Sequence, residues 1–123
     1  MSLLLSHSVT GDRQAERTAF VLHGILGSLR NWRSFARRIA AACPGWRLVL
    51  VDLRGHGDSH PATPPNTVAA AAADLDRLAQ HLGVRPELVM GHSFGGKVAM
   101  AYGRDFPRGL DQVWVLDALP GAD

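Results

Sequence analysis

Hydrophobic residues along the chain fall into short unbroken runs that are separated by longer, periodic segments. Four such runs, rich in Val and Leu and without alternating polar positions, span residues 19–22, 48–53, 88–90 and 113–116. Runs of this length are typical of strands buried on both faces, as in a parallel sheet. A leading strand is predicted at residues 3–9, because Thr10, Gly11 and Asp12 after it form a turn signal.

Between these runs, apolar residues recur with the period of an α-helix. Three segments show this spacing, and we expect helices at residues 32–43, 68–82 and 94–106. Pro44 and Gly45 stop the first helix. Asn66 or Thr67 can cap the second helix, and Gly83 can end it.

Strands and helices therefore alternate in the order β-β-α-β-α-β-α-β. Strands joined by helices of ten or more residues form right-handed crossovers. The expected fold is α/β, with a doubly wound, mostly parallel sheet in a single domain. In such a sheet, ligands bind beyond the carboxyl ends of the strands, so residues that follow the predicted strands are candidates for chemistry.

Composition and charge exclude several classes of protein. Of the 123 residues, 46% are hydrophobic and 20% are charged, which is too apolar for a disordered tail and too mixed for a coiled coil. The net charge is +2, and the basic residues cluster only on one predicted helix, at Arg30, Arg33, Arg37 and Arg38. We interpret this cluster as a solvated helix face and expect neither nucleic acid nor a membrane as partner; the alternative is a patch for one of these.

The single cysteine, Cys43, can form neither an internal disulfide nor a thiolate metal site. The apolar residues 3–5 make too brief a run for a signal peptide. No run approaches the ~18 apolar residues that a membrane helix needs. We therefore expect a cytoplasmic protein without a metal.

One strand-to-helix junction carries the most specific catalytic motif. Residues 91–96 read Gly-His-Ser-Phe-Gly-Gly between a predicted buried strand and a predicted helix. This matches the nucleophile elbow G-x-S-x-G, whose sharp turn holds a serine in a strained conformation and needs small flanking residues. The hydroxyl of Ser93 would stand at the N-terminus of the next helix, where the dipole favours negative charge. The alternative is a glycine-rich helix entry with a capping serine.

Two more motifs follow predicted strands. His23 and Gly24 follow the run at 19–22, and residues 52–59 read Asp-Leu-Arg-Gly-His-Gly-Asp-Ser after the run at 48–51. With these motifs and the elbow, the chain resembles the α/β-hydrolase superfamily over residues 18–119. In that family the three motifs follow the third, fourth and fifth strands. Residues 23–28 and 116–120 are similar to the small bacterial acyl-ester esterases of the abhydrolase-domain type.

The resemblance implies a role for each matching position. Ser93 is expected to be the nucleophile that attacks an ester carbonyl, and the backbone N–H groups of Ile25 and Phe94 to form the oxyanion hole. Asp117, after the run at 113–116, is expected to be the acid that orients a histidine. The alternative for Asp117 is a loop carboxylate that caps a helix or binds backbone. Most members of the family carry the acid after the seventh strand, so an acid beyond these residues also stays open.

The histidines depart from the family pattern. All six, at positions 7, 23, 56, 60, 81 and 92, precede Ser93, whereas the family order is serine, acid, histidine. His23 and His92 match positions that pack and hydrogen-bond around the elbow in the family. We therefore expect residues 1–123 to be the N-terminal part of one α/β-hydrolase domain, truncated after the sixth family strand and lacking the C-terminal strands, lid and histidine segment.

Two further interpretations concern structure more than chemistry. Asp52 and Asp58 with Arg54 could suggest a metal or phosphate site, but we interpret them as a turn braced by an Asp–Arg pair. Four aromatic residues are expected in the core: Trp32, Phe35, Trp46 and Trp114. Phe94 and Ile25 are additional candidates to line an acyl pocket.

The expected function is a serine hydrolase of small-molecule carboxylic esters or thioesters, with an acyl-serine intermediate and no cofactor. Cofactor-free haloperoxidases and C–C bond hydrolases keep the same serine elbow and stay open as alternatives. A second alternative is a non-catalytic fragment or pseudoenzyme that binds a ligand or partner chain. The run at 113–116 would be an exposed sheet edge, through which we expect homo-association or recruitment of a complementing C-terminal half.

Overall fold

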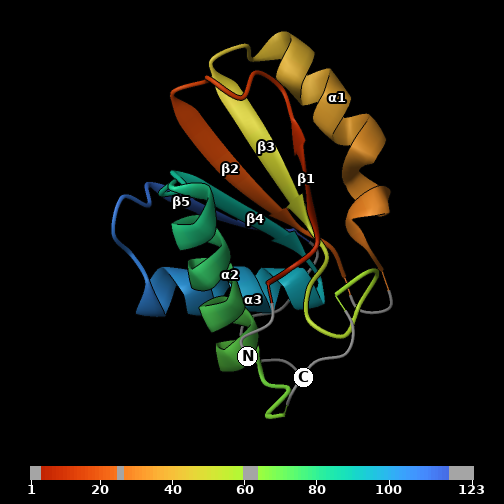
Figure 1. Cartoon of the computed structure of the whole chain (residues 1–123), viewed down its shortest axis with the longest axis vertical. Helices are drawn as coiled ribbons and strands as arrows, with labels where there is room; N and C mark the ends of the chain where they lie inside the picture. The colour runs from red at the N-terminus through yellow and green to blue at the C-terminus, as the bar shows by residue number, and fades with distance from the viewer. Residues whose placement is uncertain (1–3, 25–26, 60–63, 117–123) are drawn as a thin grey trace.

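The central element of the fold is a five-stranded sheet (Figure 1), seen in a computed structural model that describes residues 4–24, 27–59 and 64–116. The strands lie in the order β1 (His7–Thr10), β3 (Trp46–Val51), β2 (Arg17–Leu22), β4 (Leu88–His92) and β5 (Gln112–Leu116). Strands β3, β2, β4 and β5 are parallel, and β1 runs antiparallel to β3. The doubly wound, mostly parallel sheet predicted from the sequence is therefore confirmed.

Helices cover both faces of this sheet (Figure 1). On one face, η1 (Leu29–Trp32) and α1 (Arg33–Ala42) pack over Val21, Leu48 and Leu50. On the other face, α2 (Val68–Leu82) and α3 (Phe94–Asp105) pack over the alternate side chains of the same strands, which include Phe20, Leu22, Val49 and Val51. Successive strand residues point to opposite faces, so unbroken Val and Leu runs supply two cores at once.

The ends of α2 follow from single residues. The Thr67 hydroxyl accepts a hydrogen bond from the Ala70 N–H at 3.0 Å, which satisfies one free donor of the first turn. Gly83 ends the helix with a left-handed φ of 67°, a conformation that glycine adopts without a Cβ penalty. Both boundaries agree with the sequence prediction.

The first strand is shifted from its prediction at residues 3–9. It spans His7–Thr10, and its last residue pairs with Leu48 of β3. Ser6, just before it, lies opposite Asp52 in this register, and its carbonyl accepts the Asp52 N–H at 2.9 Å. The Ser6 N–H, however, donates to the Ser59 hydroxyl at 2.9 Å, so the loop after β3 takes the donor that would have extended the ladder.

Trp114 does not lie in the core, contrary to the sequence prediction. Its side chain is 47% exposed on β5, which pairs with β4 alone within residues 4–24, 27–59 and 64–116. The other three aromatic residues are half-buried against the sheet face under α1. That helix lies against β1 and β3, away from β5. The exposed Trp114 borders an apolar groove of about 230 Å³ that Phe35, Ile39, Trp46 and Met90 also line.

None of the helices in the described part of the chain is long and apolar enough to cross a membrane. The four arginines of the basic cluster are all exposed along η1 and α1.

Candidate functional site

The carboxyl ends of the parallel strands lie together at one end of the sheet. Leu22 of β2 is in register with Val51 of β3 and with Gly91 of β4, and His92 of β4 is in register with Leu116 of β5. The residues that follow these strands therefore lie at the same end, which is where doubly wound sheets bind ligands. The sequence motifs predicted to carry chemistry all begin here.

Ser93 has the backbone conformation of a nucleophile elbow. Its φ is 55° and its ψ is −114°, and it is the one non-glycine residue with positive φ in the segments described. A conformation of this kind costs about 1–3 kcal/mol and is held by the surrounding structure. The Ser93 N–H donates to the Leu116 carbonyl at 3.0 Å, and α3 begins at the next residue.

Two glycines make this turn possible. A Cβ on Gly91 would overlap the carbonyl of Gly95 across the turn. A Cβ on Gly95 would lie 2.5 Å from the His23 carbonyl oxygen, where no real Cβ is found. Strand β4, helix α3 and the end of β2 can approach this closely only because both positions lack a side chain. The Ser93 hydroxyl does not cap α3, so it is not used to stabilise the helix.

His23 is fully buried beside the elbow and is held as a neutral imidazole. Its Nδ1 lies 2.7 Å from the Gly24 carbonyl, and its Nε2 lies 2.9 Å from the Leu53 N–H. A carbonyl only accepts and a peptide N–H only donates, so Nδ1 carries the proton and Nε2 is the acceptor. Burial lowers the pKa of His23 below its usual value, and the nearby His56 lowers it further. With both nitrogens engaged, His23 is a structural residue and not a free base.

The loop after β3 is fixed by the buried carboxylate of Asp52. This carboxylate accepts the N–H of Leu29 at 2.8 Å and the N–H of Asp58 at 3.0 Å. Gly57 has a φ of 51°, and a Cβ there would overlap the Asp52 carboxylate. Asp52 therefore binds the start of η1 to the loop, and the metal or phosphate interpretation of this carboxylate has no support.

Arg54 pairs with a different residue from the one expected. The predicted Asp–Arg brace within the turn is wrong, because Arg54 forms two hydrogen bonds to the Asp74 carboxylate of α2, at 2.6 and 3.0 Å. The side chain of Asp74 is 0% exposed and that of Arg54 10%, so the pair is desolvated. Arg77 also pairs with Asp74, and the Arg54 guanidinium donates to the Pro65 carbonyl at 2.6 Å. Arg54 thus anchors the turn to α2.

His56, in the same loop, lies against the elbow. Its ring is stacked on the Phe94 ring, with centroids 6.2 Å apart and planes 23° apart. The centroid of the His23 ring lies 5.0 Å from the centroid of the His56 ring. The His56 Nδ1 lies 3.0 Å from the Arg54 carbonyl and donates to it. No sequence pattern predicted this contact, because the two residues belong to separate motifs.

The structure brings together only part of the predicted site. Ser93 and Phe94 lie at the elbow, and Phe94 is the first residue of α3. Ile25 and Asp117, the other predicted site residues, lie outside the described residues. Within the segments described, no group of three or more His, Cys, Asp or Glu side chains could hold a metal ion.

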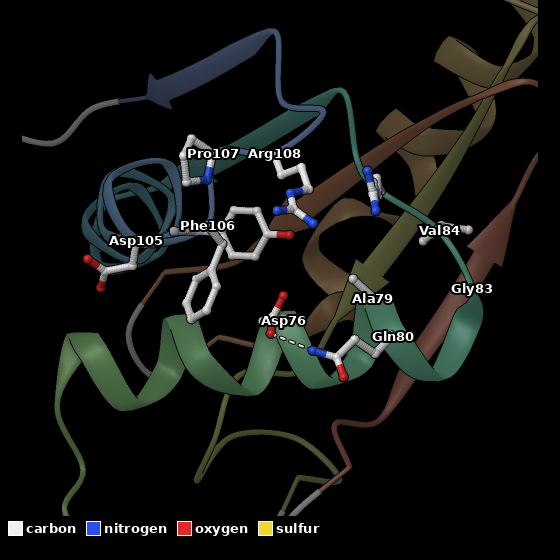
Figure 2. Close-up of a pocket in the computed structure, with 11 residues that line it drawn as sticks. Asp76, Ala79, Gln80, Gly83, Val84, Asp105, Phe106, Pro107 and Arg108 are labelled. Atoms are coloured by element: carbon white, nitrogen blue, oxygen red, sulfur yellow. Dashed lines mark hydrogen bonds between the residues drawn. The ribbon is translucent and has the colours of Figure 1, made fainter.

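A groove of about 820 Å³ lies away from the carboxyl ends of the strands, at the C-terminal ends of α2 and α3 (Figure 2). Figure 2 shows Asp76 and Gln80 on α2 opposite Phe106 and Arg108. Burial, with the nearby Asp76, raises the pKa of Tyr102 in this groove to about 12, so its phenol stays protonated. The groove is one helix length from Ser93 and its lining carries both charge signs, so it is not part of the elbow site.

The family model described as "alpha/beta hydrolase fold" matches residues 20–123. An sn-1-specific diacylglycerol lipase of Mus musculus is 38% identical over 110 residues, which cover 89% of this chain and 35% of the lipase. A 2-succinyl-6-hydroxy-2,4-cyclohexadiene-1-carboxylate synthase of Serratia proteamaculans is 33% identical over 120 residues, covering 96% of this chain and 45% of the synthase.

Solved structures of esterases also match this chain. An esterase from a marine microorganism superposes with a TM-score of 0.88 at 30% identity, over 99% of this chain and 44% of the esterase. A thermophilic esterase from Thermogutta terrifontis superposes with a TM-score of 0.83 at 28% identity, over 97% of this chain and 42% of that enzyme. The chain therefore spans less than half the length of these relatives.

Proposed function

The chain belongs to the alpha/beta hydrolase family, and we propose that its protein is a serine hydrolase of carboxylic esters or thioesters. The observation that carries the proposal is the strained Ser93 at a glycine-flanked strand-to-helix turn. Its hydroxyl does not cap α3, so helix capping in the described structure does not account for a serine there. Ser93 has a strained backbone, does not cap the helix and lies at the end of the sheet where such folds bind ligands. A role as nucleophile explains these features best.

The proposed reaction is acyl transfer. The Ser93 hydroxyl attacks the carbonyl carbon of the ester, a base takes its proton, and the alcohol or thiol leaves after the tetrahedral intermediate collapses. The Phe94 N–H is the proposed donor to the oxyanion, because the first N–H groups of a helix have no acceptor within the helix and Phe94 is the first residue of α3. The Ile25 N–H is the proposed second donor. Water then attacks the acyl-serine and releases the acid.

The mechanism also needs a base, which in this family is a histidine that follows the nucleophile in the sequence. No histidine occurs at residues 94–123, and the buried His23 has both ring nitrogens engaged. We propose that the base comes from a part of the protein outside these 123 residues, which would form the N-terminal part of a single hydrolase domain. Asp117 directly follows Leu116, whose carbonyl accepts the Ser93 N–H, and is the proposed acid.

Labelling with a serine-reactive fluorophosphonate tests the proposal. We expect the protein translated from the complete reading frame to label at Ser93 and its Ser93→Ala variant not to label. Ser34→Ala, which removes an exposed serine of α1, is the matched control and should label like the wild type. The isolated 123-residue chain should label weakly or not at all, because a serine without a base is a poor nucleophile.

The alternative function is a non-catalytic protein that binds a ligand or a partner chain. Absence of labelling at Ser93 in the complete protein, with the fold intact by circular dichroism, would favour it over the hydrolase. Rapid labelling of the isolated chain that Ser93→Ala abolishes would overturn the proposal that the base lies elsewhere.

A further inference from the structure

We infer that His56 is a positioning residue for the oxyanion donor Phe94, an inference that rests on the hydrolase function proposed above. The observation behind it is the stack of the His56 ring on the Phe94 ring, with centroids 6.2 Å apart and planes 23° apart. Aromatic rings interact favourably at centroid distances of ~4.5–7 Å in offset or tilted arrangements. Phe94, the proposed oxyanion donor, therefore has its side chain against a second ring.

The backbone around His56 is rigid enough for this role. The Nδ1–H of His56 donates to the Arg54 carbonyl at 3.0 Å, and the His56 N–H donates to the Leu53 carbonyl at 2.9 Å. The Gly55 N–H donates to the Ser59 carbonyl, also at 2.9 Å. These bonds fix both the ring and the turn that carries it.

The turn itself is anchored in the interior of the molecule. Arg54 forms its two hydrogen bonds with Asp74, which is 0% exposed on α2, and a third with the Pro65 carbonyl. Two parallel bonds between a guanidinium and a carboxylate fix orientation as well as distance. A displacement of this turn would separate a desolvated charge pair, which is unfavourable because each buried charge would lose its partner.

His23 also contacts the His56 ring. Its ring centroid is 5.0 Å from that of His56, and its Nε2 accepts the N–H of Leu53 in the same loop. The His56 ring thus contacts both a buried histidine and Phe94. A connected set of contacts therefore runs from the buried Asp74 through Arg54 and His56 to the residue that supplies the oxyanion N–H.

This arrangement predicts an effect on the transition state more than on substrate binding. An oxyanion forms only as the serine attacks, so a misaligned N–H lowers kcat while KM changes little. We expect His56→Ala to lower kcat about tenfold, less than the 10²–10³ typical for loss of an oxyanion donor. His56→Phe keeps a ring at this position and should stay within about threefold of the wild type.

The test uses the complete protein with p-nitrophenyl acetate as substrate and four forms: wild type, His56→Ala, His56→Phe and His81→Ala. His81 is an exposed histidine of α2 and serves as the matched control. The second readout is the ¹⁵N order parameter of the Phe94 amide, which does not depend on activity. We expect about 0.85 in the wild type, a clear decrease in His56→Ala, and recovery in His56→Phe.

The outcomes separate the two proposals. An inactive wild type would contradict the hydrolase function, and the order parameters would then decide on His56 alone. An active wild type with unchanged kcat in His56→Ala would overturn the positioning role. A change in KM without a change in kcat would also overturn it, because His56 would then be a wall of the substrate pocket.

Discussion

The Nε2 atom of His23 accepts the N–H of Leu53 at 2.9 Å, and this bond joins the end of β2 to the loop after β3. The bond needs the neutral imidazole, because a protonated ring has no acceptor nitrogen. A buried histidine therefore links the geometry of the candidate site to pH.

Acid should destabilise the protein through His23. Burial lowers the pKa of His23 in the folded state, whereas in the unfolded chain it stays near 6.5. Below about pH 6.5 the unfolded state therefore binds a proton that the folded state does not, so stability falls as pH decreases, until the folded pKa is reached. Urea unfolding between pH 7.5 and 5 should show this fall in the wild type and a smaller one in His23→Gln. His81→Gln, at an exposed site, should match the wild-type slope.

Replacing Ser93 with glycine should stabilise the protein while removing the nucleophile. The φ of 55° strains serine and does not strain glycine, so we expect Ser93→Gly to raise the free energy of unfolding by ~1–2 kcal/mol. Ser93→Ala keeps a Cβ and should change it little. Equal stabilities of the glycine and alanine variants in chemical denaturation would argue against strain at this residue.

The elbow glycines should not tolerate alanine. Gly95→Ala puts a Cβ against the His23 carbonyl and should cost about 2–3 kcal/mol of stability through overpacking and backbone shift. Gly45→Ala is the control, because a Cβ there meets nothing within 4 Å. Thermal denaturation of both variants measures the difference. A Gly95→Ala protein as stable as Gly45→Ala would mean that the turn can open.

Breaking the interior charge pair should be costly. Asp74→Asn leaves the desolvated Arg54 guanidinium without its carboxylate, and removing one partner of a buried pair typically costs about 3–5 kcal/mol. Asp76→Asn changes a half-buried carboxylate on the same helix that accepts a hydrogen bond from Gln80, and it should cost under about 1 kcal/mol. Equal losses in urea denaturation would show that Arg54 finds other partners.

The β5 edge should associate when the chain is expressed alone. Trp114 and Leu116 are exposed on a strand that is paired on one side in the described structure, and such an edge is a template for another strand. We expect the 123-residue chain to dimerise, aggregate or bind a complementing C-terminal half, and Trp114→Lys to weaken this association. Sedimentation at micromolar concentration measures it, and a monodisperse wild-type monomer would contradict the prediction.

The sequence predicted the sheet well because the Val and Leu runs and the helical periods are local properties. It also located Ser93, since G-x-S-x-G between a strand and a helix is a local pattern with a mechanical cause. It could not give the partner of Arg54, because Asp74 lies on a helix that a long loop separates from it. For the same reason it missed the stack of His56 on Phe94, whose motifs meet only in the folded sheet.

Trp114 shows a different limit. A hydrophobic run predicts a buried strand, but burial depends on which elements lie against it, and the sequence of the strand carries no information on that. The first strand was misplaced for a related reason, since Ser6 finds its partners in the loop after β3. In both cases a tertiary contact, present or absent, outweighed the local pattern.

The position of β2 between β3 and β4 has a consequence for synthesis on the ribosome. Leu22 pairs with Val51 of β3 on one side and with Gly91 of β4 on the other. Because β2 precedes both strands in the sequence, it is synthesised before either neighbour. After β3 has emerged, the second side of β2 waits for β4, a delay of several seconds at ~5–20 residues per second. During that time Phe20 and Leu22 lie on an apolar strand that is paired with β3 on one side and open on the other, so this is the interval in which the nascent chain is most exposed to pairing with another strand.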